Sequence, residues 1–132
     1  MIKSPRFIRP HKIIVKNKLD EIEGNAQYHS TTINHVSVDT KYGIKQSQKG
    51  IEPDGTTKIV IDLNDLVAFE GMKRRSYVDP IEFGDLVDIE KVFTIAPDDL
   101  LLFKGKEYTV NSITEVSQTE IVPCFLEIIA NE

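Results

Sequence analysis

The sequence predicts a mainly β fold: a small antiparallel β-barrel or sandwich with long loops and at most one or two short helices. Three observations support this prediction. The last third of the chain has the pattern of three consecutive strands, within 99–116 and 120–130. Tryptophan is absent, and the abundance of Ile and Val favours strands. Val36 and Val38 alternate with polar neighbours in 28–39, and Ile59, Ile61 and Leu63 lie on one face of 58–63, which is typical of strands with one buried face.

Length, charge and cysteine content indicate one soluble domain. A chain of 132 residues with 40% hydrophobic residues can bury a single core, so we expect one β domain over 1–132. The formal charge of −5 argues against sequence-independent binding to nucleic acid phosphates. The single cysteine, Cys124, lies in an apolar run and is expected to be a buried thiol. Without an apolar leader or membrane segment, the expected setting is cytoplasmic.

The first half of the chain predicts an arm, a hairpin and a long loop. Residues 1–10 combine two prolines with basic residues and predict an extended N-terminal arm. Strands are expected at 12–16 and 28–39, joined through an acidic turn at 20–25 and able to pair as a hairpin. Residues 40–56 contain three glycines and have the composition of a long loop.

The middle of the chain combines one clear strand with weaker patterns. Residues 58–63 predict a strand with alternate residues buried. Asn64 and Asp65 are candidate N-caps for a short helix over 66–70 that Gly71 would end. Residues 72–88 predict a second long loop, before a strand near 91–95 and a turn at 96–98.

The terminal meander is predicted in most detail. A two-residue turn at Lys104-Gly105 joins its first two strands, because glycine accepts positive φ angles. After Val110 the apolar pattern shifts by one residue, to Ile113, which predicts a β-bulge at Asn111–Ser112. A bulge bends its strand, as a small barrel requires.

The sequence lacks the residue spacings of known catalytic and metal-binding motifs. The three histidines and Cys124 are not spaced as metal ligands. The glycines do not form a phosphate-binding loop, and no serine or threonine lies in a strained nucleophile turn. Acidic clusters near 85–90 and 98–99 do not follow the order of a calcium loop, so we expect solvated surface there. We therefore expect no enzyme, no cofactor and no metal.

Charged and aromatic residues of the two long loops are the candidate contacts with partners. The triplet Lys73-Arg74-Arg75, next to Tyr77, forms a local positive patch that could contact a phosphate backbone, although we favour a protein neighbour. The candidate partner or ring contacts are Lys41, Tyr42, Lys45, Lys49, Lys73, Arg74, Arg75 and Tyr77.

Four segments together carry a family resemblance: Ile13–Asn25, Ile33–Asp39, Thr57–Gly71, and Leu101–Val110 leading to Ile113. In the order of these segments the chain resembles the small minor capsid or head-tail joining proteins of tailed phages and prophages of Gram-positive bacteria. The resemblance implies a head-completion connector: a small β-barrel that assembles in a ring beneath the portal and bridges it to the tail. The stretch 72–88 is longer than the family pattern, which leaves the register between 63 and 101 open.

The expected function is therefore structural. We expect a homo-oligomeric connector of virion assembly that contacts phage portal or adaptor proteins and tail proteins and no membrane. Passing contact with DNA in a channel is compatible with this role. It would act in the bacterial host cytoplasm and at the head-tail junction of the virion. The alternatives are a tail-terminator protein and an oligonucleotide-binding β-barrel that uses Tyr42, Tyr77 and Phe83. A pI near 5.2 counts against the second alternative.

Overall fold

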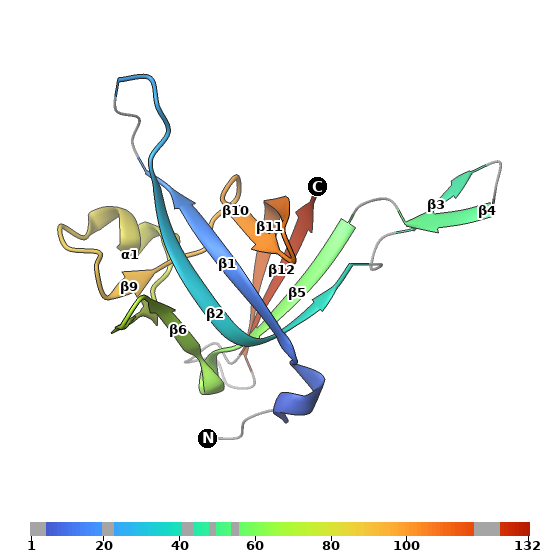
Figure 1. The fold of residues 1–132 in the computed structure, drawn as a ribbon, viewed down its shortest axis with the longest axis horizontal. Coiled ribbons are helices and arrows are strands. Elements are labelled where there is room, and N and C mark those ends of the chain that lie inside the picture. The colour runs from blue at the N-terminus through green and yellow to red at the C-terminus, as the bar shows by residue number, and fades with distance from the viewer. Residues whose placement is uncertain (1–4, 20–22, 41–43, 48–49, 54–55, 118–124) are drawn as a thin grey trace.

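The computed structural model describes residues 5–19, 23–40, 44–47, 50–53, 56–117 and 125–132, with the backbone alone for 44–47 and 50–53. Most described strands belong to one antiparallel sheet of eight strands (Figure 1). In chain order the elements are η1 (Arg6–Ile8), β1 (His11–Lys18), β2 (Tyr28–Asp39), β3 (Ile44–Ser47), β4 (Gly50–Pro53), β5 (Thr56–Asp62), η2 (Leu63–Asp65), β6 (Val67–Glu70), β7 (Lys73–Arg74), β8 (Ser76–Tyr77), α1 (Pro80–Asp85), β9 (Val92–Phe93), β10 (Leu100–Phe103), β11 (Lys106–Val116) and β12 (Phe125–Asn131).

Six strands pair in a closed ring that forms the barrel. The ring runs β1-β10-β11-β12-β5-β2, and β2 pairs back to β1. Closure removes the open edges that a flat sheet of these strands would leave. The mainly β prediction is confirmed, and the expected hairpin of 12–16 with 28–39 is the pair β1 and β2.

The core lies inside this ring, because alternate residues of each strand point inward. In β5 the buried residues Ile59 and Ile61 lie on the predicted buried face. Two residues that do not belong to the ring strands, Phe93 of β9 and Ile95, are part of the same core. The buried apolar residues are Ile13, Val15, Ile33, Val36, Val38, Ile59, Ile61, Ala68, Phe93, Ile95, Leu101, Phe103, Tyr108, Val110, Leu126, Ile128 and Ala130.

The turn and the bulge of the meander are both where the sequence predicts them. Lys104 and Gly105 have φ angles of 50° and 79°, so both central residues of the β10–β11 turn are left-handed, as a type I′ hairpin turn requires. The pairing of β11 with β12 shifts between Val110 and Ser112, which leaves Asn111 as the extra residue of a bulge.

One edge of β2 serves two partners. β5 pairs with Val36–Asp39, and β6 pairs with Thr32–Asn34 farther along the same strand. Between these two zones His35 has a φ angle of 58°, and η2 carries the chain from β5 to β6. The strand β2 therefore bends where the η2 turn leaves the barrel.

The predicted helix over 66–70 is wrong, because this segment forms strand β6. Its backbone is paired with β2 on one side and β7 on the other. The side chain of Asp62, not of Asn64 or Asp65, accepts the capping N–H bond at η2, from Asn64. Gly71 has a φ angle of 59° and lies in the β6–β7 turn.

Both segments expected as long loops contain short regular elements. Residues 40–56 include β3 and β4, which pair with each other. Residues 72–88 include β7, β8 and α1, whose N-cap is Asp79 and whose first residue is Pro80. No helix in the described ranges is long and apolar enough to cross a membrane.

Candidate interaction surfaces

The β3–β4 ribbon contains one of the predicted contact residues, Lys45. Among the described strands, β3 and β4 pair with no other strand, and Figure 1 shows the ribbon standing away from the barrel. Lys45 lies in β3, whereas Lys41, Tyr42 and Lys49 lie outside the described residues. The ribbon thus presents two strand edges that the described chain does not use.

The basic triplet at 73–75 does not form a free positive patch. Lys73 Nζ lies 3.0 Å from a carboxylate oxygen of Glu90. Arg75 donates from Nε to the Glu90 carbonyl at 2.9 Å and from one terminal nitrogen to Ser30 O and Thr31 Oγ1. Two of the three cations therefore attach β7 and the residue after it to β2 and to the segment before β9. Arg74 is exposed.

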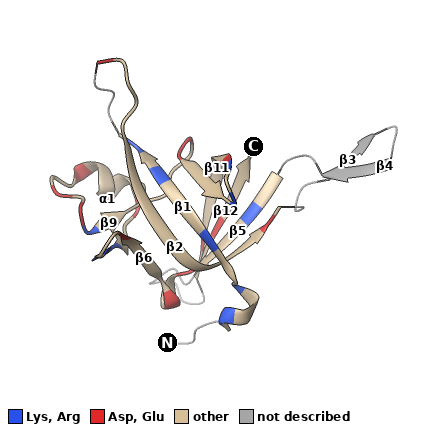
Figure 2. Cartoon of the chain, in the orientation of Figure 1, with Lys and Arg blue, Asp and Glu red and all other residues tan. Residues whose placement is uncertain are grey.

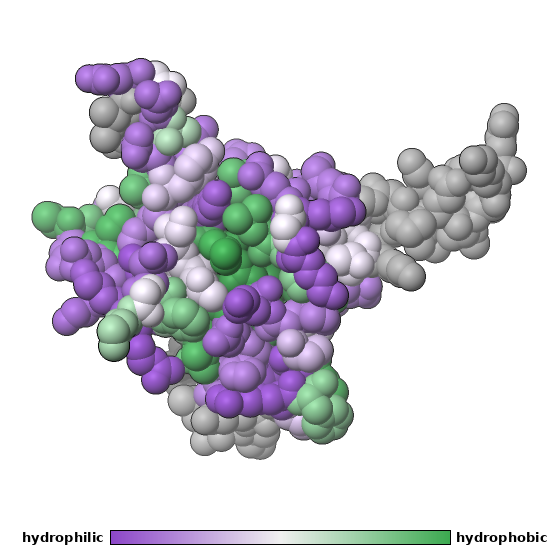
Figure 3. Space-filling model, viewed as in Figure 1, coloured by the Kyte–Doolittle hydropathy of each residue, from purple (hydrophilic) through white to green (hydrophobic). Residues whose placement is uncertain are grey.

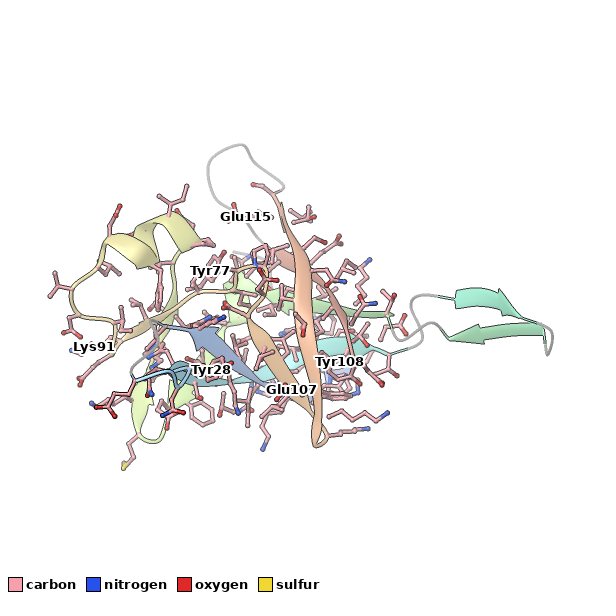
Figure 4. The ribbon with its side chains drawn as sticks, turned by 90° about the horizontal axis from the view of Figure 1, so that it is seen from above. Tyr28, Tyr77, Lys91, Glu107, Tyr108 and Glu115 are labelled. Carbon is pink, nitrogen blue, oxygen red and sulfur yellow. The ribbon has the colours of Figure 1, made fainter. Side chains whose placement is uncertain are left out.

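Tyr77, the last predicted contact, lies in β8 and packs against the barrel core. Its ring packs edge-on against buried Phe93, with centroids 5.8 Å apart. Figure 4 shows Tyr77 of β8 beside Glu115 of β11. Burial raises the pKa of Tyr77 to about 12, and the negative charges of Glu115 and Asp79 add to the shift. The Tyr77 ring is therefore placed for packing and not for stacking on a base.

A groove of about 800 Å³ lies between α1 and the barrel. We call it the α1 groove. Its apolar lining comes from three places: Leu19 after β1, the segment from Phe83 to Ile89, and the turn at Ala96-Pro97. Its polar lining includes Lys18, Gln27, Asp98 and Asp99.

A buried hydrogen-bond network builds the barrel side of the α1 groove. The carboxylate of Asp99 accepts from Asn17 Nδ2 at 2.8 Å and from the backbone N–H groups of Lys18 and Ala96 at 3.0 and 2.9 Å. Asn17 also donates to the Thr94 carbonyl. The three bonds from Asn17 and Lys18 hold 94–99 against β1.

Two contacts of His29 hold the other wall, which carries α1. His29 Nε2 lies 2.8 Å from the Val92 carbonyl, and its ring lies 5.8 Å from that of Phe83. The segment 79–90, which includes α1, contains Asp79, Glu82, Asp85, Asp88 and Glu90 and no Lys or Arg. The rim of the groove is therefore acidic on the α1 side (Figure 2), whereas Lys18 lies on the barrel side.

Exposed apolar side chains gather at the α1 groove and at the N-terminal arm. Ile81 and Val87, on and after α1, are fully or almost fully exposed, and Leu86 is partly exposed. On the arm, Phe7 is 81% exposed and Ile8 is 52% exposed. Figure 3 shows these two apolar areas at separate places on the molecule. Exposed apolar clusters of this kind mark interaction sites in soluble proteins.

The arm is fixed to the barrel by an ion-pair cluster. Arg6 binds the Asp65 carboxylate in a fork, with Nε and a terminal nitrogen at 2.8 and 2.9 Å. Arg9, whose side chain is 2% exposed, donates to the same carboxylate at 3.0 Å and to the His35 carbonyl at 2.8 Å. The bonds from Arg6, and then from Arg9, hold the pKa of Asp65 well below its usual range.

His11, His29 and His35 were considered above as metal ligands. His11 Nδ1 accepts the Val38 N–H at 3.1 Å, and burial beside Lys104 lowers the pKa of His11. Within the described ranges, no three His, Cys, Asp or Glu side chains are grouped as metal ligands. Cys124 lies outside those ranges.

Two features were missed by the sequence analysis: the Asp65 cluster and the α1 groove. Asp65 is 59 residues from Arg6 along the chain, so no local pattern indicates their pairing. The distribution of charged residues along the chain does distinguish the arm from the segment beside the α1 groove. Residues 1–12 contain four basic and no acidic residues, whereas 79–90 contain five acidic and no basic residues.

Residues 9–126 match the model of a family described as Family of unknown function (DUF6751). The match runs from β1 through β11 into the first two residues of β12, and so includes the β3–β4 ribbon and the α1 groove. No curated protein matches the sequence.

Proposed function

The chain belongs to the Family of unknown function (DUF6751), and we propose that it is a structural protein of virion assembly. In this proposal it is a head-tail connector subunit of a phage or prophage, which forms a ring that joins the portal to the tail. Its partners are portal or adaptor proteins, tail proteins and further copies of itself.

The observation that carries the proposal is the β3–β4 ribbon on a closed barrel. Two-stranded ribbons are marginally stable alone in water, and both outer edges of this one are unused within the described chain. A strand from a neighbouring protein can pair with such an edge and stabilise it. The closed barrel offers no equivalent edge, so the appended parts are suited to assembly contacts.

The same geometry gives less support to an oligonucleotide-binding barrel. That function needs a positive groove with exposed aromatic rings. Here Lys73 and Arg75 contact the protein itself, Tyr77 packs on Phe93, and the groove beside Phe83 has an acidic rim.

The test is assembly with the portal protein encoded in the same phage or prophage genome. We expect ring-sized species, alone or on the portal, in light scattering and electron microscopy. A variant in which a short Asn-Gly turn replaces 41–55 should keep the barrel, as judged by circular dichroism and thermal unfolding, and lose assembly. A strictly monomeric protein that binds neither portal nor tail proteins would overturn the proposal.

A further inference from the structure

We propose that the N-terminal arm of one subunit docks in the α1 groove of a second copy. Phe7 and Ile8 enter the groove, and the basic arm faces its acidic rim. This inference rests on the proposed function, because the same contact repeated from subunit to subunit would build the ring.

The apolar parts of the two surfaces match in kind and size. The 3-10 turn η1 presents Phe7 and Ile8 to solvent. Phe7 is 81% exposed and Ile8 is 52% exposed. The α1 groove offers Leu19, Phe83 and Leu86 among its lining residues. Its volume of about 800 Å³ is within the range of about 300–1,000 Å³ that encloses drug-sized ligands, so it can hold one aromatic and one aliphatic side chain.

The charges of the two surfaces are complementary. Lys12 is exposed at the base of the arm, and the Arg6 side chain is 56% exposed although it bonds to Asp65. Glu82 and Asp85 are exposed on α1, in a segment, 79–88, that contains no Lys or Arg. Two α1 segments would repel each other, which favours contact of α1 with an arm.

The anchoring of the arm identifies the occupant as a second copy. Arg9 is buried and bound to Asp65, so η1 is held next to η2. Figure 1 shows η1 and α1 at well-separated places around the barrel, so a subunit cannot place its anchored η1 in its own groove. Contacts between unlike surfaces are heterologous, and they close into rings when the rotation between subunits allows it.

The test uses two variants, each of which damages one side of the contact. Phe7→Ser/Ile8→Ser removes the apolar tip and leaves Arg6 and Arg9 in place. Leu86→Arg adds bulk and positive charge to the groove. We expect each variant alone to lose self-association at least about tenfold, as for truncated anchor residues, and an equimolar mixture to form a one-to-one dimer. Met72→Ser is the matched control, because Met72 is fully exposed but lies in the β6–β7 turn.

Sedimentation equilibrium measures the self-association of each protein at low and high salt. The wild-type contact should weaken at high salt, because salt screens the charges. If Phe7→Ser/Ile8→Ser forms rings as the wild type does, the docking is overturned, while the connector role stands. If the wild type stays monomeric, a second experiment tests the docking: a peptide of residues 1–12 is added at millimolar concentration to the Phe7→Ser/Ile8→Ser variant. Amide NMR shifts confined to 83–89 and 96–98 support the docking, and absent or scattered shifts overturn it.

Discussion

The barrel and the segment between β6 and β10 are held together by different kinds of contact. In the barrel each strand pairs with its neighbours through regular backbone hydrogen bonds around a shared apolar core. The segment 71–99 has strands of two residues and a helix of six. It is attached by individual side chains such as Arg75, which reaches Ser30, and Asn17, which reaches Thr94. Changes in the barrel should therefore alter global stability, and changes in this segment should act through single contacts.

The largest effect is expected from truncation of a core residue. Leu101 is fully buried in β10, so Leu101→Ala should cost about 3 kcal/mol of unfolding free energy, within the range of roughly 2–5 kcal/mol for such changes. Leu86→Ala, the matched change beside α1, should cost less than about 1 kcal/mol, because Leu86 is 38% exposed. Urea unfolding measures both. Equal losses would show that Leu86 is packed as closely as Leu101.

The next effect is expected from the anchor of the arm. Asp65→Asn leaves the buried guanidinium of Arg9 without its 3.0 Å partner. We expect a cost of about 3 kcal/mol, at the low end for breaking a buried ion pair, since Asp62 remains 3.9 Å from Arg9. Thermal unfolding of the variant, compared with Glu107→Gln on the exposed side of β11, measures the loss.

The Asp65 carboxylate also predicts how stability depends on pH. Its pKa is lowered in the folded protein, so the folded state binds fewer protons at this site than the unfolded state. The stabilisation is complete above the ordinary aspartate pKa of about 4 and is lost as the pH falls below it toward the lowered value. Asp65→Asn should flatten the unfolding midpoint between about pH 5 and 2 relative to wild type. An unchanged acid slope would contradict the assignment.

The sequence predicted those parts of the fold that depend on neighbouring residues in the chain. Tyr28–Asp39 has the predicted strand bounds, and the turn at Lys104-Gly105 and the bulge at Asn111 follow from glycine chemistry and a one-residue shift in the apolar pattern. Each of these features can be recognised within a window of about ten residues.

What the sequence could not predict depends on distant contacts. Residues 66–70 have the capping residues of a helix, but pairing with β2 and β7 makes them a strand, because ladder bonds outweigh a weak propensity. The triplet at 73–75 has the composition of a free patch, and only the fold brings Glu90 and Ser30 to it. The α1 groove combines residues from three separate parts of the chain.

A smaller difference in stability is expected between substitutions of two cations of the triplet, Arg75 and Lys73. Arg75→Met should cost about 2 kcal/mol, because it removes charge-assisted hydrogen bonds that hold the β6–β7 turn to β2. Lys73→Met should cost no more than about 0.5–1 kcal/mol, since Lys73 and Glu90 form an exposed pair. Guanidinium unfolding gives both values, and a larger loss for Lys73 would reverse the assignment of the structural role.

The smallest effects come from two glycines of opposite expected sign. Gly105 has a φ angle of 79° in the β10–β11 turn, so Gly105→Ala should cost about 1 kcal/mol through backbone strain. Gly84 lies in α1, and a Cβ there meets no atom within 4 Å. Gly84→Ala should therefore stabilise the protein by about 0.5 kcal/mol, because it reduces the entropy of the unfolded chain. Chemical denaturation of both variants measures the signs. A destabilising Gly84→Ala would contradict the open, helical position that the structure gives to Gly84.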